Sequence, residues 1–407
     1  MPAIALRCRA CGAQYNDDVV GSCDDCFGPL QPVYDWDALR GSVTHESIAS
    51  GPPSIWRYAP LLPVDAPADA RLAPGLTPLL PAPRLASSLG LGRLSLKVDT
   101  ANPTHSFKDR AVAVAAVKAH ELGISTLACS STGNLANAVA ARAAADGMSA
   151  AVFCPADLEP EKLVATAVYG ATIYAVDGSY DDCSRLTLEL LSEVPWGFVN
   201  VGLRTYYAEG SKTIAFEIAE QLDWRLPDAL FCPIGSGALF SRIYEGFEQL
   251  RTLGLVSGEL PRMFGAQAAG CAPVATAYAS GRPVVPVKPR TLARSIAIGD
   301  PADGDLAVEV ALRSGGAVIS VPEEHIADSM GSLAETTGVF GETAAGTTLG
   351  ALQAALANGD IEHDDEVIVL VSGDGLKTPE PVSRRLQPVG IEPNVASVLE
   401  RLPVAVR

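Results

Sequence analysis

Short apolar runs alternate with helix-forming segments from about residue 93 onward, and this alternation constrains the fold of the 407-residue chain most. Each apolar run has the length of a strand, and turn residues separate it from the next segment. Strand–helix alternation predicts a parallel sheet with helices on both faces. The expected strands are 94–98, 126–130, 150–154, 172–176, 229–233, 263–267 and 366–372, and the expected helices are 110–121, 135–145, 161–169, 211–222 and 239–250.

Three turns that follow a strand and precede a helix are candidate site loops, because sites in such folds lie at the carboxyl ends of the strands. They read NPTHSFKDR (102–110), SSTGN (130–134) and GSGA (235–238). The third turn has almost no side chains, so its N–H groups can converge on an anion at a helix start. A plain tight turn explains that loop equally well.

Lys108 stands at the start of the first of these helices. The helix dipole favours anions there, so a lysine suggests amine chemistry or contact with an anion. A Schiff-base lysine must lose its proton before it can attack, which burial promotes. An exposed surface lysine is the competing interpretation of Lys108 alone.

The composition limits the functional classes. A net charge of −17 disfavours nucleic acid as a partner, although a pocket inside an acidic protein can still be positive. A hydrophobic content of 48% with 19% charged residues indicates a globular chain. There is no apolar run of about 18 residues for a membrane span and no signal-peptide pattern, so we expect a cytoplasmic protein.

Four of the nine cysteines form two C-x-x-C pairs near the N-terminus. Two such knuckles across a hairpin-sized spacer can place four thiolates around one tetrahedral ion, which predicts structural zinc. A ribbon that keeps its cysteines without metal is the alternative. The predicted ligands are Cys8, Cys11, Cys23 and Cys26.

The order of the motifs resembles that of fold-type II pyridoxal-phosphate (PLP) enzymes, and among these the threonine synthases resemble the chain most. The resemblance extends from about residue 6 to residue 380 and includes the cysteine ribbon, which a subset of the family has. It is carried by KVDTANPTHSFKDRAV, SSTGN, LRTYYAEGSKTIAFEIAEQL, a GSGAL-type loop, RTLARSIAIGDPADG, FGETAAGTTLGAL and VSGDGLKTPE.

This resemblance implies an α/β fold with two parallel-sheet subdomains and a small N-terminal zinc-ribbon-like unit. The ribbon, expected to be a separate unit, spans 1–35, and a proline-rich connector spans 36–80. The catalytic domain spans 81–385, with a smaller subdomain at about 110–205, and a C-terminal tail spans 386–407. The resemblance further implies a biosynthetic lyase and a homodimer.

The resemblance also implies roles for single residues. Lys108 would bind the cofactor covalently, Asn134 would bind its 3-oxygen, and Ser372 would face its pyridine nitrogen. Phe107 would pack beside the lysine. The cofactor phosphate would be held by Gly235, Ser236, Gly237, Ala238 and Leu239, and the substrate carboxylate by Ser131, Thr132 and Gly133.

The implied substrate is O-phospho-L-homoserine, which would lose phosphate from its γ-carbon and add water at its β-carbon to give L-threonine. Arg204 and Lys212 are candidates for the second phosphate; Lys212 has an exposed helix residue as its alternative. Many bacterial relatives carry an arginine where this chain has Tyr207. A threonine or serine dehydratase of the same fold and a non-catalytic PLP-binding protein are the alternative functions.

Residues around Lys108 have further interpretations. Thr104 and Ser106 are candidate substrate contacts that are also suited to cap the following helix. Asp109 and Arg110 are interpreted as a structural charge pair. His105 stands where many relatives carry glycine, and we expect it near the substrate or behind it.

Overall fold

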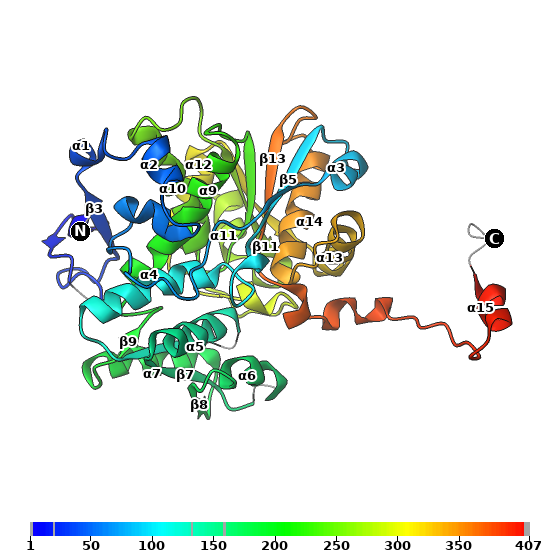
Figure 1. The fold of residues 1–407 in the computed structure, drawn as a ribbon, viewed down its shortest axis with the longest axis horizontal. Coiled ribbons are helices and arrows are strands. Elements are labelled where there is room, and N and C mark those ends of the chain that lie inside the picture. The colour runs from blue at the N-terminus through cyan, green and yellow to red at the C-terminus, as the bar shows by residue number, and fades with distance from the viewer. Residues whose placement is uncertain (1–2, 19–20, 132, 158–159, 403–407) are drawn as a thin grey trace.

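The computed structural model describes residues 3–18, 21–131, 133–157 and 160–402, and three sheets organise them (Figure 1). The sheet orders are β2-β1-β3, β12-β11-β10-β13-β5-β4 and β8-β7-β6-β9. The strands are β1 (Ala3–Cys8), β2 (Gln14–Tyr15), β3 (Leu30–Tyr34), β4 (Leu79–Pro81), β5 (Arg93–Val98), β6 (Thr126–Ser130), β7 (Ser149–Pro155), β8 (Thr172–Val176), β9 (Gly197–Phe198), β10 (Ala229–Pro233), β11 (Arg262–Ala268), β12 (Ala317–Val321) and β13 (Glu366–Val371).

Helices connect and cover these strands. The α-helices are α1 (Trp36–Leu39), α2 (His45–Ala49), α3 (Pro83–Leu89), α4 (Lys108–Glu121), α5 (Asn134–Asp146), α6 (Pro160–Ala167), α7 (Tyr180–Glu189), α8 (Arg204–Glu209), α9 (Thr213–Gln221), α10 (Ala238–Thr252), α11 (Pro273–Ser280), α12 (Gly304–Arg313), α13 (Glu323–Thr337), α14 (Thr343–Asn358) and α15 (Val395–Arg401). The 3-10 turns η1 (Ile55–Leu61), η4 (Gly210–Lys212) and η7 (Gly375–Lys377) also matter below. Within the described residues, no helix is both long and apolar enough to cross a bilayer.

The predicted α/β arrangement with two parallel sheets is confirmed. Each strand and helix expected from the sequence lies within two residues of an observed one. In the larger sheet β5 runs parallel to β13, with Val98 opposite Val371, so the turns after these strands leave the same edge. The edge strand β4 pairs antiparallel with β5 and comes from the proline-rich connector, where we expected no strand. The predicted domain boundaries stay predictions.

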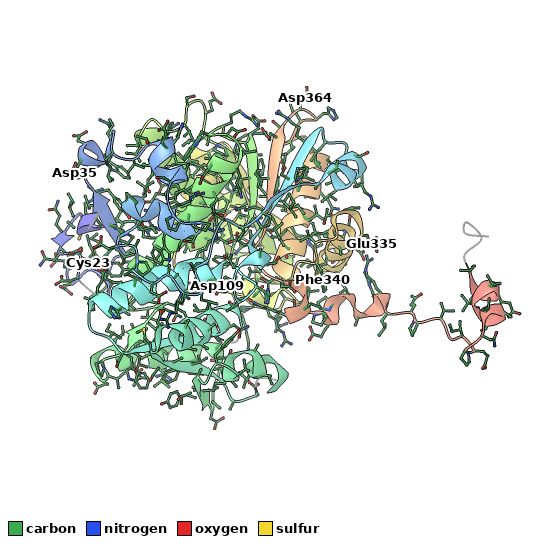
Figure 2. All side chains as sticks on the ribbon, viewed as in Figure 1. Cys23, Asp35, Asp109, Glu335, Phe340 and Asp364 are labelled. Carbon is green, nitrogen blue, oxygen red and sulfur yellow. The ribbon has the colours of Figure 1, made fainter. Side chains whose placement is uncertain are left out.

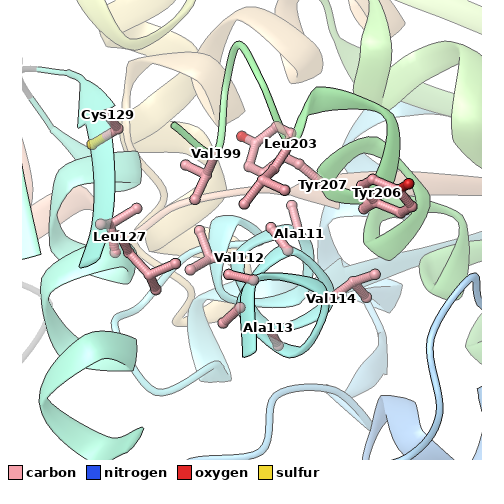
Figure 3. Close-up of a cluster of buried hydrophobic side chains, with 14 of the residues drawn as sticks. Ala111, Val112, Ala113, Val114, Leu127, Cys129, Val199, Leu203, Tyr206 and Tyr207 are labelled. Atoms are coloured by element: carbon pink, nitrogen blue, oxygen red, sulfur yellow. The ribbon is translucent and has the colours of Figure 1, made fainter. Parts of the chain in front are cut away.

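The N-terminal ribbon has its own sheet but not its own core. Its side chains Leu6, Cys8, Cys23 and Leu30 belong to the same buried cluster as α4 and α5. Figure 3 shows the α4 side of this cluster, where Ala111 and Val112 face Leu127, Val199 and Leu203. The ribbon therefore packs against α4 and α5, because a three-stranded sheet of this size cannot bury enough apolar surface alone.

A buried cluster of charged residues joins the first turn of α4 to the larger sheet. Arg110 Nε donates to Asp99 Oδ2 at 2.7 Å, and its Nη2 donates to Glu217 Oε2 at 2.7 Å. Lys97 Nζ also donates to Glu217 Oε2, at 2.7 Å. These side chains are fully buried.

The predicted charge pair between Asp109 and Arg110 is wrong. Asp109, at the centre of the molecule in Figure 2, accepts hydrogen bonds from the backbone N–H and the hydroxyl of Thr104, both at 2.8 Å. Consecutive residues on a helix point in different directions, which is why neighbours in sequence do not pair here.

We expect Glu217→Gln to lower the free energy of unfolding by about 3–5 kcal/mol, because it leaves the buried Lys97 without an anionic partner and leaves Arg110 with Asp99 alone. Urea unfolding followed by circular dichroism at neutral pH measures this change. The exposed Glu259 provides the control variant Glu259→Gln, which should change stability by less than about 0.5 kcal/mol. Equal effects of the two substitutions would contradict the account.

The same variant should alter the acid sensitivity of the fold. Burial raises the pKa of the Glu217 carboxyl, but Arg110 and Lys97 outweigh burial and lower this pKa from 4.5 to about 2. A carboxyl group with a depressed folded-state pKa stabilises the fold above its unfolded pKa, and that contribution is lost as the pH falls from 4.5 toward 2. Glu217→Gln should lack this part of the pH dependence.

Candidate active site and metal centre

The turns after the neighbouring strands β5 and β13 meet at the start of α4. Phe107 N–H donates to the Ser372 carbonyl at 3.0 Å, and Asp374 N–H donates to the His105 carbonyl at 3.1 Å. The turn after β13 is therefore fastened to the turn after β5. Ser372 is 2% exposed. His105 lies on the same turn with a φ of 61°, in the left-handed region where glycine is free of strain.

Lys108 is the first residue of α4, and its side chain is partly buried. Its Nζ donates to the Tyr207 hydroxyl at 2.6 Å. The Phe107 ring lies beside the amine, with its centroid 4.7 Å away, as the resemblance implied for this residue. The Tyr207 contact was not expected from the sequence.

Asn134, the first residue of α5, is held from two sides. Its Nδ2 donates to both carboxylate oxygens of Glu342 at 3.1 Å, and its Oδ1 accepts from Lys377 Nζ at 2.6 Å. Lys377 Nζ also donates to the Thr104 carbonyl at 2.5 Å. These contacts fix the orientation of the amide. Burial raises the pKa of the Glu342 carboxyl and lowers the pKa of the Lys377 amine.

The turn before α5 has polar groups directed at its own helix. Ser131 Oγ accepts from Gly133 N–H at 3.3 Å and from Ala136 N–H at 3.2 Å, so the hydroxyl caps α5 and keeps its own proton free to donate. Space is open on the α-carbon of Gly133, where an added Cβ would meet nothing within 4 Å. Thr132, the third predicted carboxylate contact, lies outside the described residues.

Thr104 and Ser106 differ in how their hydroxyls are used. The Thr104 hydroxyl donates to Asp109, so it orders the turn. The Ser106 hydroxyl is fully buried and has no hydrogen-bond partner among the described residues. A buried hydroxyl without a partner costs free energy, which indicates that a ligand group completes this site.

The loop of small residues after β10 leads into α10 through Gly237. Gly237 has a φ of 93°, and a Cβ on it would overlap the Asp303 carbonyl, so only glycine suits this position. The first N–H groups of α10 have no partner inside the helix and are available to an anion. Asp303 N–H donates to the Ser236 carbonyl at 2.8 Å and braces the loop.

Two arginines meet on Asp303 beside this loop. Arg9 Nη2, from the ribbon, donates to Asp303 Oδ1 at 2.6 Å, and Arg204, at the start of α8, pairs with Asp303 Oδ2. The two guanidinium groups share one carboxylate, so Asp303 alone does not neutralise both of them. The structure thus places Arg204 next to the predicted phosphate loop.

Lys212 does not reach the predicted phosphate loop and is enclosed in the protein interior. Its amine is fully buried, donating to Glu209 Oε2 at 2.5 Å and to the Tyr34 hydroxyl at 2.9 Å. Burial lowers the pKa of this amine. The structure gives Lys212 a place between the ribbon and α10 instead of the substrate contact suggested by the sequence, which had no means of showing a partner 178 positions away.

The residues present fit pyridoxal phosphate. An amine that can bind an aldehyde, an oriented amide and an unpartnered buried hydroxyl lie on the turns after β5 and β6. A glycine loop at a helix start follows β10, which runs parallel to its neighbour β13. Lys108 would hold the aldehyde carbon, Asn134 the 3-oxygen and the loop the phosphate. The loop residues are Gly235, Ser236, Gly237, Ala238 and Leu239.

The four ribbon cysteines form a candidate metal centre. Their sulfur atoms all lie within 4.8 Å of one another, with the pairs Cys8–Cys26 and Cys11–Cys23 at 3.5 Å. Zn²⁺ bound tetrahedrally by four thiolates needs sulfur atoms at about this spacing. Four thiolates close the coordination sphere, so the centre is structural. Figure 2 shows Cys23 at the N-terminal edge, away from Asp109.

Tyr15 supports this centre from outside the cysteines. Its hydroxyl lies 3.1 Å from Cys23 Sγ and accepts from Asp24 N–H at 2.9 Å. The Tyr15 hydroxyl lowers the pKa of the Cys23 thiol to about 6, which favours the thiolate that a metal requires.

The comparison with protein families matches residues 70–373 to the family described as pyridoxal-phosphate dependent enzyme. This defines the class of protein. Threonine synthase from Methanosarcina acetivorans is 35% identical over 402 residues, 98% of each chain. The enzyme of that name from Methanocaldococcus jannaschii is 34% identical over 97% of this chain and 98% of its own, and that from Synechocystis is 37% identical over 80% and 83%. The chain therefore belongs to the pyridoxal-phosphate dependent enzymes and, among them, to the threonine synthase family.

Solved structures show the same fold. An L-serine ammonia-lyase from Rhizomucor miehei aligns with a TM-score of 0.66 at 21% identity, covering 76% of this chain and 97% of its own. Threonine deaminase isoform 2 from Solanum lycopersicum aligns with a TM-score of 0.63 at 19% identity, covering 76% and 83%. The predicted fold-type II architecture is thereby confirmed.

Five residues of this site had no assigned role in the sequence prediction: Arg9, Tyr207, Asp303, Glu342 and Lys377. Glu342 and Lys377 had a signal, because each is a charged residue inside a small-residue motif, FGETAAGTT and SGDGLK. Arg9 and Asp303 pair across 294 positions, which local patterns do not indicate.

We expect about one zinc ion per chain in protein purified without chelator, measured by elemental analysis. Cys11→Ser should lose most of the metal and lower the melting temperature, because it removes one of four ligands. The buried Cys271, outside the ribbon, provides the control Cys271→Ser, which should keep its metal. Metal-free wild-type protein of unchanged stability would refute this centre.

Proposed function

We propose that the protein is a threonine synthase that converts O-phospho-L-homoserine and water to L-threonine and phosphate. The observation that carries this proposal is the 35% identity to a threonine synthase over 98% of both chains. The residues around Lys108 support it, because the chain offers an amine, an oriented amide and a glycine loop that could hold the cofactor.

The bound cofactor would draw electrons from the substrate carbons next to it, which allows protons to leave those carbons. The chain's own residues supply the rest. Lys108 Nζ would accept and return protons, because the amine that releases the cofactor to the substrate stays beside the substrate carbons. Ser131 and Gly133 would bind the substrate carboxylate, with Thr132 between them.

The substrate's own phosphate requires a second positive site. Arg204 supports this role, because its guanidinium is 28% exposed and lies beside Asp303 next to the Gly237 loop. Arginine binds phosphate through two parallel hydrogen bonds. A dehydratase that acts on threonine or serine has no use for a second phosphate site. The homodimer implied by the resemblance stays a prediction, which light scattering on the purified protein would test.

Turnover tests the proposal directly. The purified protein, supplied with pyridoxal phosphate, should release phosphate and L-threonine from O-phospho-L-homoserine in equal amounts. Parallel reactions with L-threonine and L-serine should give little 2-oxo acid. A main activity that forms 2-oxobutanoate from threonine would establish the dehydratase, and absence of turnover with cofactor bound would favour a non-catalytic protein.

Arg204→Ala should lower kcat/KM for O-phospho-L-homoserine by about 10- to 100-fold, since it removes a charged hydrogen bond to phosphate. The exposed Arg185 pairs only with Asp182 and Glu189 of its own helix among the described residues, so Arg185→Ala is the matched control. An unchanged kcat/KM in Arg204→Ala would remove this residue from the phosphate site and leave the overall function untouched.

A further inference from the structure

We propose that Tyr207 is a catalytic residue that holds the Lys108 amine by a hydrogen bond in both of its proton states. The inference rests on the proposed function for its role in turnover, but its geometry does not. Lys108 Nζ and the Tyr207 hydroxyl oxygen are 2.6 Å apart, and the tyrosine is 8% exposed. This hydroxyl thus lies on the atom that would bind the cofactor.

The packing of two helices fixes this contact. Gly210 follows Tyr207 by three residues, and a Cβ on it would overlap the carbonyl of Arg110, so the backbones touch there. Arg110 in turn follows Lys108 by two residues and is locked by Asp99 and Glu217. Tyr207 and Lys108 are therefore held opposite each other by rigid elements.

The neighbouring tyrosine serves a different purpose. The Tyr206 hydroxyl donates to the Asp17 carbonyl at 2.6 Å and ties α8 to the ribbon. In Figure 3 the hydroxyls of Tyr206 and Tyr207 point in opposite directions. One helix thus carries a tyrosine for docking the ribbon and a tyrosine for the amine, which gives a matched pair for comparison.

Apolar surroundings of the Lys108 amine increase the influence of the Tyr207 hydroxyl on it. The Phe107 and Tyr207 rings lie 4.7 and 5.3 Å from Lys108 Nζ, so apolar surface covers two sides of it. The Val199 and Leu203 side chains extend this apolar wall around Tyr207 (Figure 3). In such surroundings a polar partner for the amine has a large effect on its reactivity.

A phenol suits an amine that changes its proton count, because its oxygen can accept one hydrogen bond and donate another. The protonated amine donates N–H to the phenol oxygen. The neutral amine, ready to bind an aldehyde or remove a proton, accepts O–H from the phenol at its lone pair. The phenol keeps its own proton throughout, so the amine gains and loses its proton without passing it to Tyr207.

Tyr207→Phe removes only the hydroxyl and tests this proposal. Cofactor-free protein is mixed with pyridoxal phosphate, the reaction is stopped with borohydride at set times, and peptide mass spectrometry measures the cofactor fixed on Lys108. We expect about 10- to 100-fold slower attachment with an unchanged final extent. Tyr206→Phe should attach the cofactor at the wild-type rate.

The same variants separate the outcomes. In threonine formation, Tyr207→Phe should lower kcat by a similar factor with little change in KM, because the amine and not substrate binding is affected. Attachment at the wild-type rate would overturn the proposal, as would equal slowing in both variants, which would indicate a structural effect of α8. Slow attachment in a protein whose wild type does not form threonine would overturn the proposed function and leave the role of Tyr207 at Lys108 intact.

Discussion

The buried contacts of Arg110 with Asp99 and Glu217 are the constraint on which the active site depends. They fasten the first turn of α4 to the turn after β5 and to α9, and Lys108 begins that same turn of α4. Such a cluster contributes little net stability relative to an apolar core. It does fix how α4 sits against its neighbours, since a shift of the helix would leave a buried charge unpaired. We infer that it is there to place Lys108.

The ribbon is part of the catalytic architecture and not an appendage. It shares a core with α4 and α5, its Asp17 carbonyl binds Tyr206, and its Arg9 reaches Asp303 beside the phosphate loop. Arg9 lies between the first two cysteines, so a metal held there would fix the segment from which this arginine extends. The elements that contact the ribbon, α8 above all, also carry Arg204 and Tyr207.

Local pattern in the sequence predicted the strands and helices well where apolar runs were long. It missed the short strands β9 and β4, whose pairing comes from neighbouring strands and not from their own sequences. It also left β12 and the helices α3, α7 and α11 to α14 unassigned. The cofactor residues that we propose came from the order of the motifs and the family resemblance. What no local pattern could supply was the partnership of Arg110 with Glu217, which lies 107 positions away, since burial and distant contacts decide it.

We propose that the turns after β5, β6, β10 and β13 form one cofactor site around Lys108. Borohydride reduction of the cofactor-loaded protein, followed by peptide mapping, tests this arrangement. We expect label on the Lys108 peptide at about one per chain and none in Lys108→Ala, because a Schiff base forms with a single positioned amine. Label that settles instead on another lysine, such as Lys377 in the same site, would contradict it.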